Sequence, residues 1–259
     1  MSIALREHTT NEGDTMRHTI TRWSSIAVAA AALLAVGVFA VTAGADPSTT
    51  IDRAWAGAPR FSHPGRIDNR YLPLTRRTRC ELRGKADDGT RERSVKTVLE
   101  RTKRFTVGGR RVEAVVIQDN AYEDGKLVES TLDYYAQADD GTVYYFGEQV
   151  KNLANGKVVD THGTWLYGKD TDRLGVAMPA RPTLGRQWHF EDVPGLTTES
   201  NRVEEVGLRT KVNGRVMSDV IRVQEFIQPE AVEYKLYVAG IGSVAEYPPG
   251  ARIALAGCR

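Results

Sequence analysis

Histidines with carboxylates close by in the sequence are the residues that could carry acid–base chemistry. His162 follows Asp160 by two positions, and His189 precedes Glu191 by two positions. Histidine titrates near neutral pH, and a carboxylate beside it can orient it or share its proton. These four residues are therefore candidate catalytic groups for a hydrolase of envelope lipid or glycan. The alternative is structural, because a histidine next to a tryptophan, as His189 is to Trp188, is typical of a partly buried packing position.

Other motifs of catalysis and cofactor binding are absent from the sequence. The histidines occur in neither HExxH nor H-x-H spacing, so no zinc site is predicted. A GxSxG elbow around Ser243 would need glycine where Ala245 stands. No P-loop or GxGxxG segment is present. An EF-hand loop with Gly125 at its sixth position would have Tyr122 at its third, where an oxygen ligand is required. We therefore predict no metal and no cofactor.

The charge of the chain argues against nucleic-acid binding. It has 35 Lys and Arg against 33 Asp and Glu, a formal net charge of +2. Proteins that hold a phosphate backbone usually concentrate basic residues on one face. Here the two signs are interspersed, so no nucleic-acid partner is predicted.

Aromatic residues gather on both sides of a turn signal at Gly141. They are Tyr134, Tyr135, Tyr144, Tyr145 and Phe146. Two strands joined by this turn would place these rings side by side, because cross-strand neighbours are in contact. One interpretation is ordinary core pairing. The other is an aromatic-lined cavity, floored by residues 61–74 and capped by the irregular residues 168–185.

If aromatic residues line a cavity, four of them are candidates for ligand contact. We assign ligand contact to Tyr134, Tyr144, Phe146 and Trp165. A mostly apolar pocket with few polar groups suits a lipid, an isoprenoid or a similar small molecule.

Turn signals recur at short intervals from residue 78 onwards. They are Asp87-Asp88-Gly89, Gly108-Gly109, Glu123-Asp124-Gly125, Asp139-Asp140-Gly141 and Ala154-Asn155-Gly156. Glycine supplies the positive φ of tight hairpin turns, and the runs between the turns are rich in Val, Thr, Tyr and Ile. The stretches 128–136 and 232–238 alternate polar and apolar residues, as strands do. We predict an all-β antiparallel meander of about ten strands curled into a barrel or half-barrel. A β-sandwich is the alternative.

Two cysteines, Cys80 and Cys258, lie near the two ends of the predicted β domain. An exported protein with two cysteines generally oxidises them to each other. We predict a disulfide that ties the first strand to the last. A redox or metal-binding thiol pair is the alternative, but the CxxC spacing of such sites is missing.

An uncharged run from Trp23 to Ala45 indicates export. Arg17 and Arg22 precede it, and the small-x-small sequence Ala43-Gly44-Ala45 at its end fits a signal-peptidase site. Met16 offers an alternative start with a more compact basic region. The run is also just long enough to remain as an uncleaved membrane anchor. We divide the chain into a signal peptide at 1–45, a linker at 46–60 and one β domain at 61–259, in a secreted or cell-envelope protein.

Two longer segments combine polar, proline and aromatic residues in a distinctive order. The first is Phe61-x-His63-Pro64-x-x-Ile67-Asp68-Asn69-x-Tyr71-Leu72-Pro73-Leu74, and the second runs from Asp133 to Glu148, DYYAQADDGTVYYFGE. Together they resemble a family of uncharacterised exported bacterial β proteins. The resemblance implies export and a β domain, and it transfers no catalytic residue.

The leading functional hypothesis is a non-catalytic binding or envelope accessory protein for an apolar or amphipathic ligand. The alternatives are the envelope lipid or glycan hydrolase and a protein-interaction module. An apolar interior would favour the first, and carboxylates converging with a histidine in a polar cleft would favour the second. An exposed apolar sheet face would favour the third. Contact with the membrane is predicted only through an uncleaved leader.

Overall fold

The computed structural model describes residues 58–74, 79–228 and 231–259. The predicted signal peptide or anchor and most of the predicted linker lie outside these residues. Within the described part of the chain, no helix is long and apolar enough to cross a membrane. Strands make up about two thirds of it and form one antiparallel sheet, which confirms the all-β meander.

Fourteen strands form in the described residues, more than the ten or so predicted. Their bounds are β1 Arg79–Ala86, β2 Arg91–Val107, β3 Arg110–Glu123, β4 Lys126–Gln137, β5 Val143–Ala154, β6 Lys157–Asp160, β7 Trp165–Leu166, β8 Gly175–Met178, β9 Gln187–Val193, β10 Thr197–Val212, β11 Arg215–Gln228, β12 Ala231–Val238, β13 Gly242–Tyr247 and β14 Ala251–Cys258. Part of the difference is β8, which lies inside the segment expected to be irregular, 168–185, and pairs with β5.

Three hairpin turns show why the local sequence makes a meander. Asp124, Asn155 and Asn213 have φ of 46°, 52° and 48°, and each is followed by a glycine that also has positive φ. Two successive left-handed residues match the right-handed twist of the flanking strands, which makes Asp-Gly and Asn-Gly the preferred hairpin turns. Each of these turns joins two strands that pair antiparallel.

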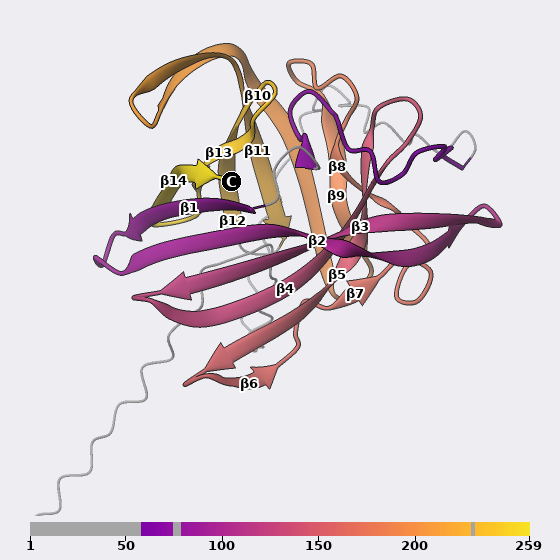
Figure 1. Cartoon of the computed structure of the whole chain (residues 1–259), viewed down its shortest axis with the longest axis horizontal. Helices are drawn as coiled ribbons and strands as arrows, with labels where there is room; N and C mark the ends of the chain where they lie inside the picture. Colours follow the sequence, from indigo (N-terminus) through magenta and orange to yellow (C-terminus); the bar gives the residue numbers. More distant parts are fainter. Residues whose placement is uncertain (1–57, 75–78, 229–230) are drawn as a thin grey trace, which may run out of the picture.

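The two ends of the β domain are paired with each other in the middle of the sheet. Its order is β6-β5-β4-β3-β2-β1-β14-β13-β12-β11-β10-β9, so the first strand pairs with the last. Strands β1–β6 run across the view in Figure 1, whereas β9–β12 run down it. Buried side chains from both halves share one hydrophobic cluster, so the two halves of the sheet pack against each other. The architecture is therefore a sheet that curls over on itself.

Close contact between β8 and β9 helps to complete the curl. A Cβ placed on Gly175 in β8 would lie 2.0 Å from the carbonyl oxygen of Phe190 in β9, so the two backbones touch directly. Among the described strands the sheet remains open between β6 and β9, because β8 pairs with β5 and not with β9. The described strands therefore form a curled sheet that does not close.

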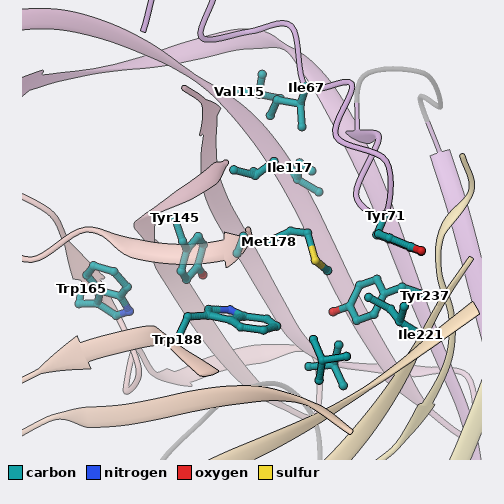
Figure 2. Close-up of a cluster of buried hydrophobic side chains, with 14 of the residues drawn as sticks. Ile67, Tyr71, Val115, Ile117, Tyr145, Trp165, Met178, Trp188, Ile221 and Tyr237 are labelled. Carbon is teal, nitrogen blue, oxygen red and sulfur yellow. The ribbon is translucent and has the colours of Figure 1, made fainter. Parts of the chain in front are cut away.

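A hydrophobic cluster fills one end of the space between the two halves. Figure 2 shows Tyr145, Trp165 and Met178 from β5, β7 and β8 meeting Trp188 of β9 and Tyr237 of β12. The segment before β1 contributes to the same cluster and covers its edge. A second cluster, on the opposite face of β2–β5, contains the aromatic rings of Phe105, Tyr134 and Phe146 and is packed by Phe61.

Polar side chains fasten the segment 58–74 across the curl. The Asn69 side-chain amide donates to the carbonyl oxygens of Gly141 (2.9 Å) and Pro179 (3.1 Å). Asp219 of β11 accepts hydrogen bonds from Arg70 and from the hydroxyl of Tyr71, the latter at 2.7 Å. Side-chain hydrogen bonds of this kind hold an irregular segment that has no ladder of its own.

We expect Asp219→Gly to loosen this segment. Asp219 has φ of 58°, where glycine is unstrained, so the substitution removes both hydrogen bonds without adding backbone strain. The Tyr71 hydrogen bond alone contributes about 1 kcal/mol, and thermal unfolding measures its loss. Asp219→Asn is the control, because asparagine also tolerates this φ and can still accept from Tyr71. An equal loss in both variants would contradict the assignment of the stabilisation to Tyr71.

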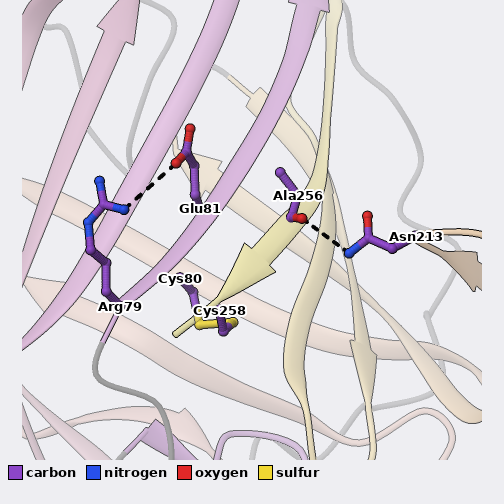
Figure 3. The surroundings of a disulfide bond; sticks show 6 residues. All are labelled: Arg79, Cys80, Glu81, Asn213, Ala256 and Cys258. Atoms are coloured by element: carbon purple, nitrogen blue, oxygen red, sulfur yellow. Dashed lines mark hydrogen bonds and ion pairs between the residues drawn. A yellow bond between two sulfur atoms is a disulfide. The ribbon is translucent and has the colours of Figure 1, made fainter.

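The disulfide between Cys80 and Cys258 is present and joins β1 to β14, as predicted. The two cysteines face each other in the strand register. Figure 3 shows the bond beside the Arg79–Glu81 ion pair, with Asn213 donating to the carbonyl oxygen of Ala256 at 3.2 Å. A disulfide is consistent with an extracellular location.

Candidate functional site

A cavity of about 180 Å³ lies inside the curled sheet. Its walls come from β1–β5 on one side and from β9 and β11–β13 on the other, and residues Leu72–Leu74 of the fastened segment contribute an apolar border. Residues 168–185 were expected to cap the cavity, and from this segment Ala177 lines it. The curl of the sheet therefore creates the site by bringing together strands that are distant in the sequence.

One wall of the cavity is aromatic. Tyr135 of β4 stacks on Tyr145 of β5 with ring centroids 4.8 Å apart, and Tyr145 stacks on Phe190 of β9 at the same distance. All three line the cavity. Stacked rings of this kind present a broad apolar surface whose tyrosine hydroxyls can still make hydrogen bonds.

The rest of the lining is rich in ionisable groups. Among the described residues, six carboxyl groups and two ammonium groups face the cavity. They are Asp119, Asp133, Glu148, Glu225, Glu233 and Glu246, with Lys96 and Lys235. Such groups are rarely placed inside a protein unless they are paired or used.

The Lys96 ammonium connects two strands that are not neighbours in the sheet. Its Nζ lies 3.2 Å from Glu246 Oε1 of β13 and 3.4 Å from Asp119 Oδ2 of β3. Burial alone would raise the pKa of Glu246, but the ammonium groups of Lys96 and Lys235 outweigh it and lower that pKa. Burial opposes charge on Lys96 as well, yet its carboxylate neighbours raise its pKa above the ordinary value. Both groups are therefore ionised at neutral pH.

Lys235 forms a second, more enclosed ion pair. Its Nζ lies 2.7 Å from Glu225 Oε2, and the two side chains are 18% and 2% exposed. Burial acts to lower the pKa of Lys235, but Glu225 and Glu246 raise it well above the usual value. Lys96 and Lys235 together thus form ion pairs with Glu246, Asp119 and Glu225.

The other three carboxyl groups have no lysine as a direct ion-pair partner in the described structure. Asp133 of β4 and Glu148 of β5 face each other in register, and the Tyr145 hydroxyl donates to Asp133 Oδ1 at 2.7 Å. Burial, and then the charge of Asp119, raises the pKa of Asp133 to about 7. Burial, and then Glu191, raises the pKa of Glu148 well above its usual value. Burial also raises the pKa of Glu233 to about 7.

Four residues were assigned to ligand contact from the sequence. They lie on the other face of the sheet or deeper in the core. Tyr134, Tyr144 and Phe146 belong to the second hydrophobic cluster, on the opposite face of the sheet. Trp165 is fully buried, and its Nε1 donates to Glu191 Oε1 at 3.0 Å. None of the four borders the cavity, and the assignment of ligand contact to them stays a prediction.

The four candidate acid–base residues are not brought together at the cavity. His162 is exposed, and Asp160 accepts from its backbone N–H at 3.0 Å and from Asn152 Nδ2 at 2.5 Å. His189 is half-buried on β9. Glu191 is fully buried, accepts from Trp165 and Thr197, and has a pKa raised to about 7 by burial. The described residues contain no group of three or more His, Cys, Asp or Glu placed to hold a metal ion.

Sequence reasoning missed the ionisable lining. In residues 232–238 the polar positions Glu233, Lys235 and Tyr237 alternate with apolar ones, which suggested a solvent-facing side. These three line the cavity, whereas Val232 is 45% exposed. The lining draws one carboxyl group from each of six strands, and a single carboxyl residue in a strand is a weak sequence signal. Comparison of the chain with protein-family models, with curated proteins and with solved structures finds no match.

Proposed function

We propose that this protein is a non-catalytic binding protein that holds a small amphipathic molecule in the cavity of its curled sheet. The observation that carries the proposal is a cavity with two kinds of wall, a stack of three aromatic rings and a set of ionisable groups. Binding sites for small molecules combine an apolar surface with a few polar groups that fix orientation. The ionisable wall favours an amphipathic ligand over a purely apolar one.

The size of the cavity limits how much of the ligand can enter. An engineered cavity of about 150 Å³ accommodates benzene, and this one measures about 180 Å³. A ligand with one ring would fit inside. A lipid or an isoprenoid would insert only its terminal group and leave the remainder at the opening.

We place this activity outside the cytoplasm. Support comes from the uncharged run at Trp23–Ala45, which ends in a sequence that fits a signal-peptidase cleavage site. The disulfide that joins the ends of the β domain gives further support. The protein is secreted or held in the cell envelope, and an uncleaved leader would anchor it to the membrane.

Native mass spectrometry of the protein purified from its own host, without reductant, tests the proposal. We expect an added mass that leaves on denaturation. Ile241→Trp enlarges a side chain in the cavity lining and should abolish the adduct, whereas Val216→Trp, at a position 59% exposed, should retain it. A bare polypeptide mass for the unmodified protein would contradict the proposal.

One observation favours the hydrolase as a second candidate. Asp133 and Glu148 form a carboxyl pair in which burial raises both pKa values, and a general acid needs a pKa near the working pH. Two such groups can share acid and base roles in glycan cleavage. Catalytic turnover of an envelope glycan or lipid that Asp133→Asn abolishes would favour this candidate over simple binding.

A further inference from the structure

The cavity contains more negative than positive groups. Six carboxyl groups face two ammonium groups in its described lining. The lysines are already engaged, Lys96 with Glu246 and Asp119, and Lys235 with Glu225. An anionic ligand would have to displace one of these pairs.

The Glu148 carboxyl group has one buried oxygen that the described residues leave unsatisfied. The side chain lines the cavity, the residue is 4% exposed, and its Oε1 has no hydrogen-bond partner among the described residues. Asp133 stands opposite in the strand register and receives one hydrogen bond, from Tyr145. A buried carboxylate is costly unless it meets a cation or takes up a proton. Burial without a directly paired cation also raises the pKa values of both groups.

We infer that the ligand carries a cationic group, an organic ammonium ion, that binds at the Glu148 and Asp133 carboxyl groups. Its apolar body would lie against the rings of Tyr135, Tyr145 and Phe190, which border the same cavity. Aromatic faces also attract cations, so both walls favour the same charge. This inference rests on the proposed binding function and adds the chemical class of the ligand.

The binding of such a cation should strengthen as the pH rises. The titratable and charged groups around Glu148 are Lys96, Asp119, Glu129, Asp133, Tyr135, Tyr145, Glu191, Glu225, Glu233, Lys235 and Glu246. Asp133, Glu191 and Glu233 have pKa values of about 7, so they lose protons between pH 5.5 and 8. An alkylammonium ion keeps its proton below about pH 9. The attraction therefore grows over this interval while the ligand charge stays constant.

Three probes that share one phenyl body test the inference. They are 2-phenylethylamine (cationic), 2-phenylethanol (neutral) and 3-phenylpropionate (anionic), each titrated calorimetrically into the full-length oxidised protein at pH 7.5. We expect the amine to bind roughly tenfold or more tightly than the alcohol, since a charge-assisted contact is stronger than a neutral one. The propionate should bind least, and the affinity for the amine should rise between pH 5.5 and 8.

Three isosteric substitutions locate the effect. Glu148→Gln should reduce the preference for the amine over the alcohol to about twofold or less, in line with the loss of one charge-assisted contact. Asp133→Asn, at the other and less buried carboxyl group of the site, should lower the same preference and gives a second test if Glu148→Gln fails to fold. Glu199→Gln is the matched control. Glu199 is also buried, at 1% exposure, and burial raises its pKa well above the usual value, but it does not line the cavity. It should leave the preference unchanged.

The outcomes separate this inference from the function on which it rests. Equal binding of the amine and the alcohol would overturn the cationic ligand and leave the binding function standing. Tightest binding of the propionate would overturn it in the same way and assign the polar wall to Lys96 and Lys235. Failure of all three probes to bind, together with a bare mass in the native spectrum, would overturn both.

Discussion

Replacing Cys80 and Cys258 together by serine is expected to lower the free energy of unfolding by about 4 kcal/mol. The disulfide closes a loop with a sequence separation of 178 residues. A crosslink over so long a loop removes many conformations from the unfolded chain, which is the main source of its stabilisation in the chain-entropy account. Urea unfolding at equilibrium, compared between the oxidised protein and the double variant, measures the difference.

The folded state should survive this substitution because other contacts hold the same strands. Arg79 and Arg259 exchange two backbone hydrogen bonds, at 2.9 and 2.8 Å, next to the disulfide. Reductant added to the unmodified protein should reproduce the loss, and reductant added to the double variant should change nothing. A loss below about 1 kcal/mol would contradict the expectation and place most of the stability in the β1–β14 ladder itself.

Local chemistry made the strands and the disulfide predictable. Hairpins such as the one at Asp124-Gly125 follow from residues that accept positive φ, and this needs no knowledge of the remaining fold. The pairing of Cys80 with Cys258 was predicted because the mature part of a chain expected to be exported has two cysteines. The bond also implies that the first and last strands of the β domain are neighbours. Their pairing joins the two halves of the sheet.

Contacts between distant segments explain what sequence reasoning missed. Residues 175–178 have no strong strand pattern of their own, yet they form β8 because β5 offers them a partner. Likewise, alternation in 231–238 shows that two faces differ but does not show which face is inside. Lys235 can point inward because Glu225, which belongs to the neighbouring strand, compensates its charge at 2.7 Å. Such compensation depends on strand register, which emerges only from the complete sheet.

The same buried carboxyl groups lead us to expect that stability falls from pH 5 to pH 8. The pKa values of Asp133, Glu191 and Glu233 are raised to about 7 in the folded protein, with burial as the largest cause in each case. Their ordinary values are near 4. Between these values the native state binds more protons than the unfolded state, so the free energy of unfolding decreases as the pH rises. Each group's contribution is complete below pH 4 and is lost as the pH passes through 7.

Carboxylates with lowered pKa act in the opposite direction and in a different interval. Hydrogen bonds from Arg104 and Thr102 lower the pKa of Glu113, and an arginine likewise lowers the pKa of Glu81. Their stabilisation is present above about pH 4.5 and is lost in more acidic solution. The two sets together place maximal stability near pH 5, on the acidic side of neutrality.

Glu191→Gln tests this origin at a single residue. A shift from 4.5 to about 7 corresponds to roughly 3 kcal/mol. We therefore expect the variant to reduce the fall in unfolding free energy between pH 5 and 8 by up to that amount, measured by urea unfolding at each pH. Glu113→Gln, whose pKa is lowered in the native protein, should leave the fall over this interval unchanged. A rise in stability from pH 5 to 8 in the unmodified protein would mean that cations neutralise the interior carboxylates, as a retained cationic ligand would.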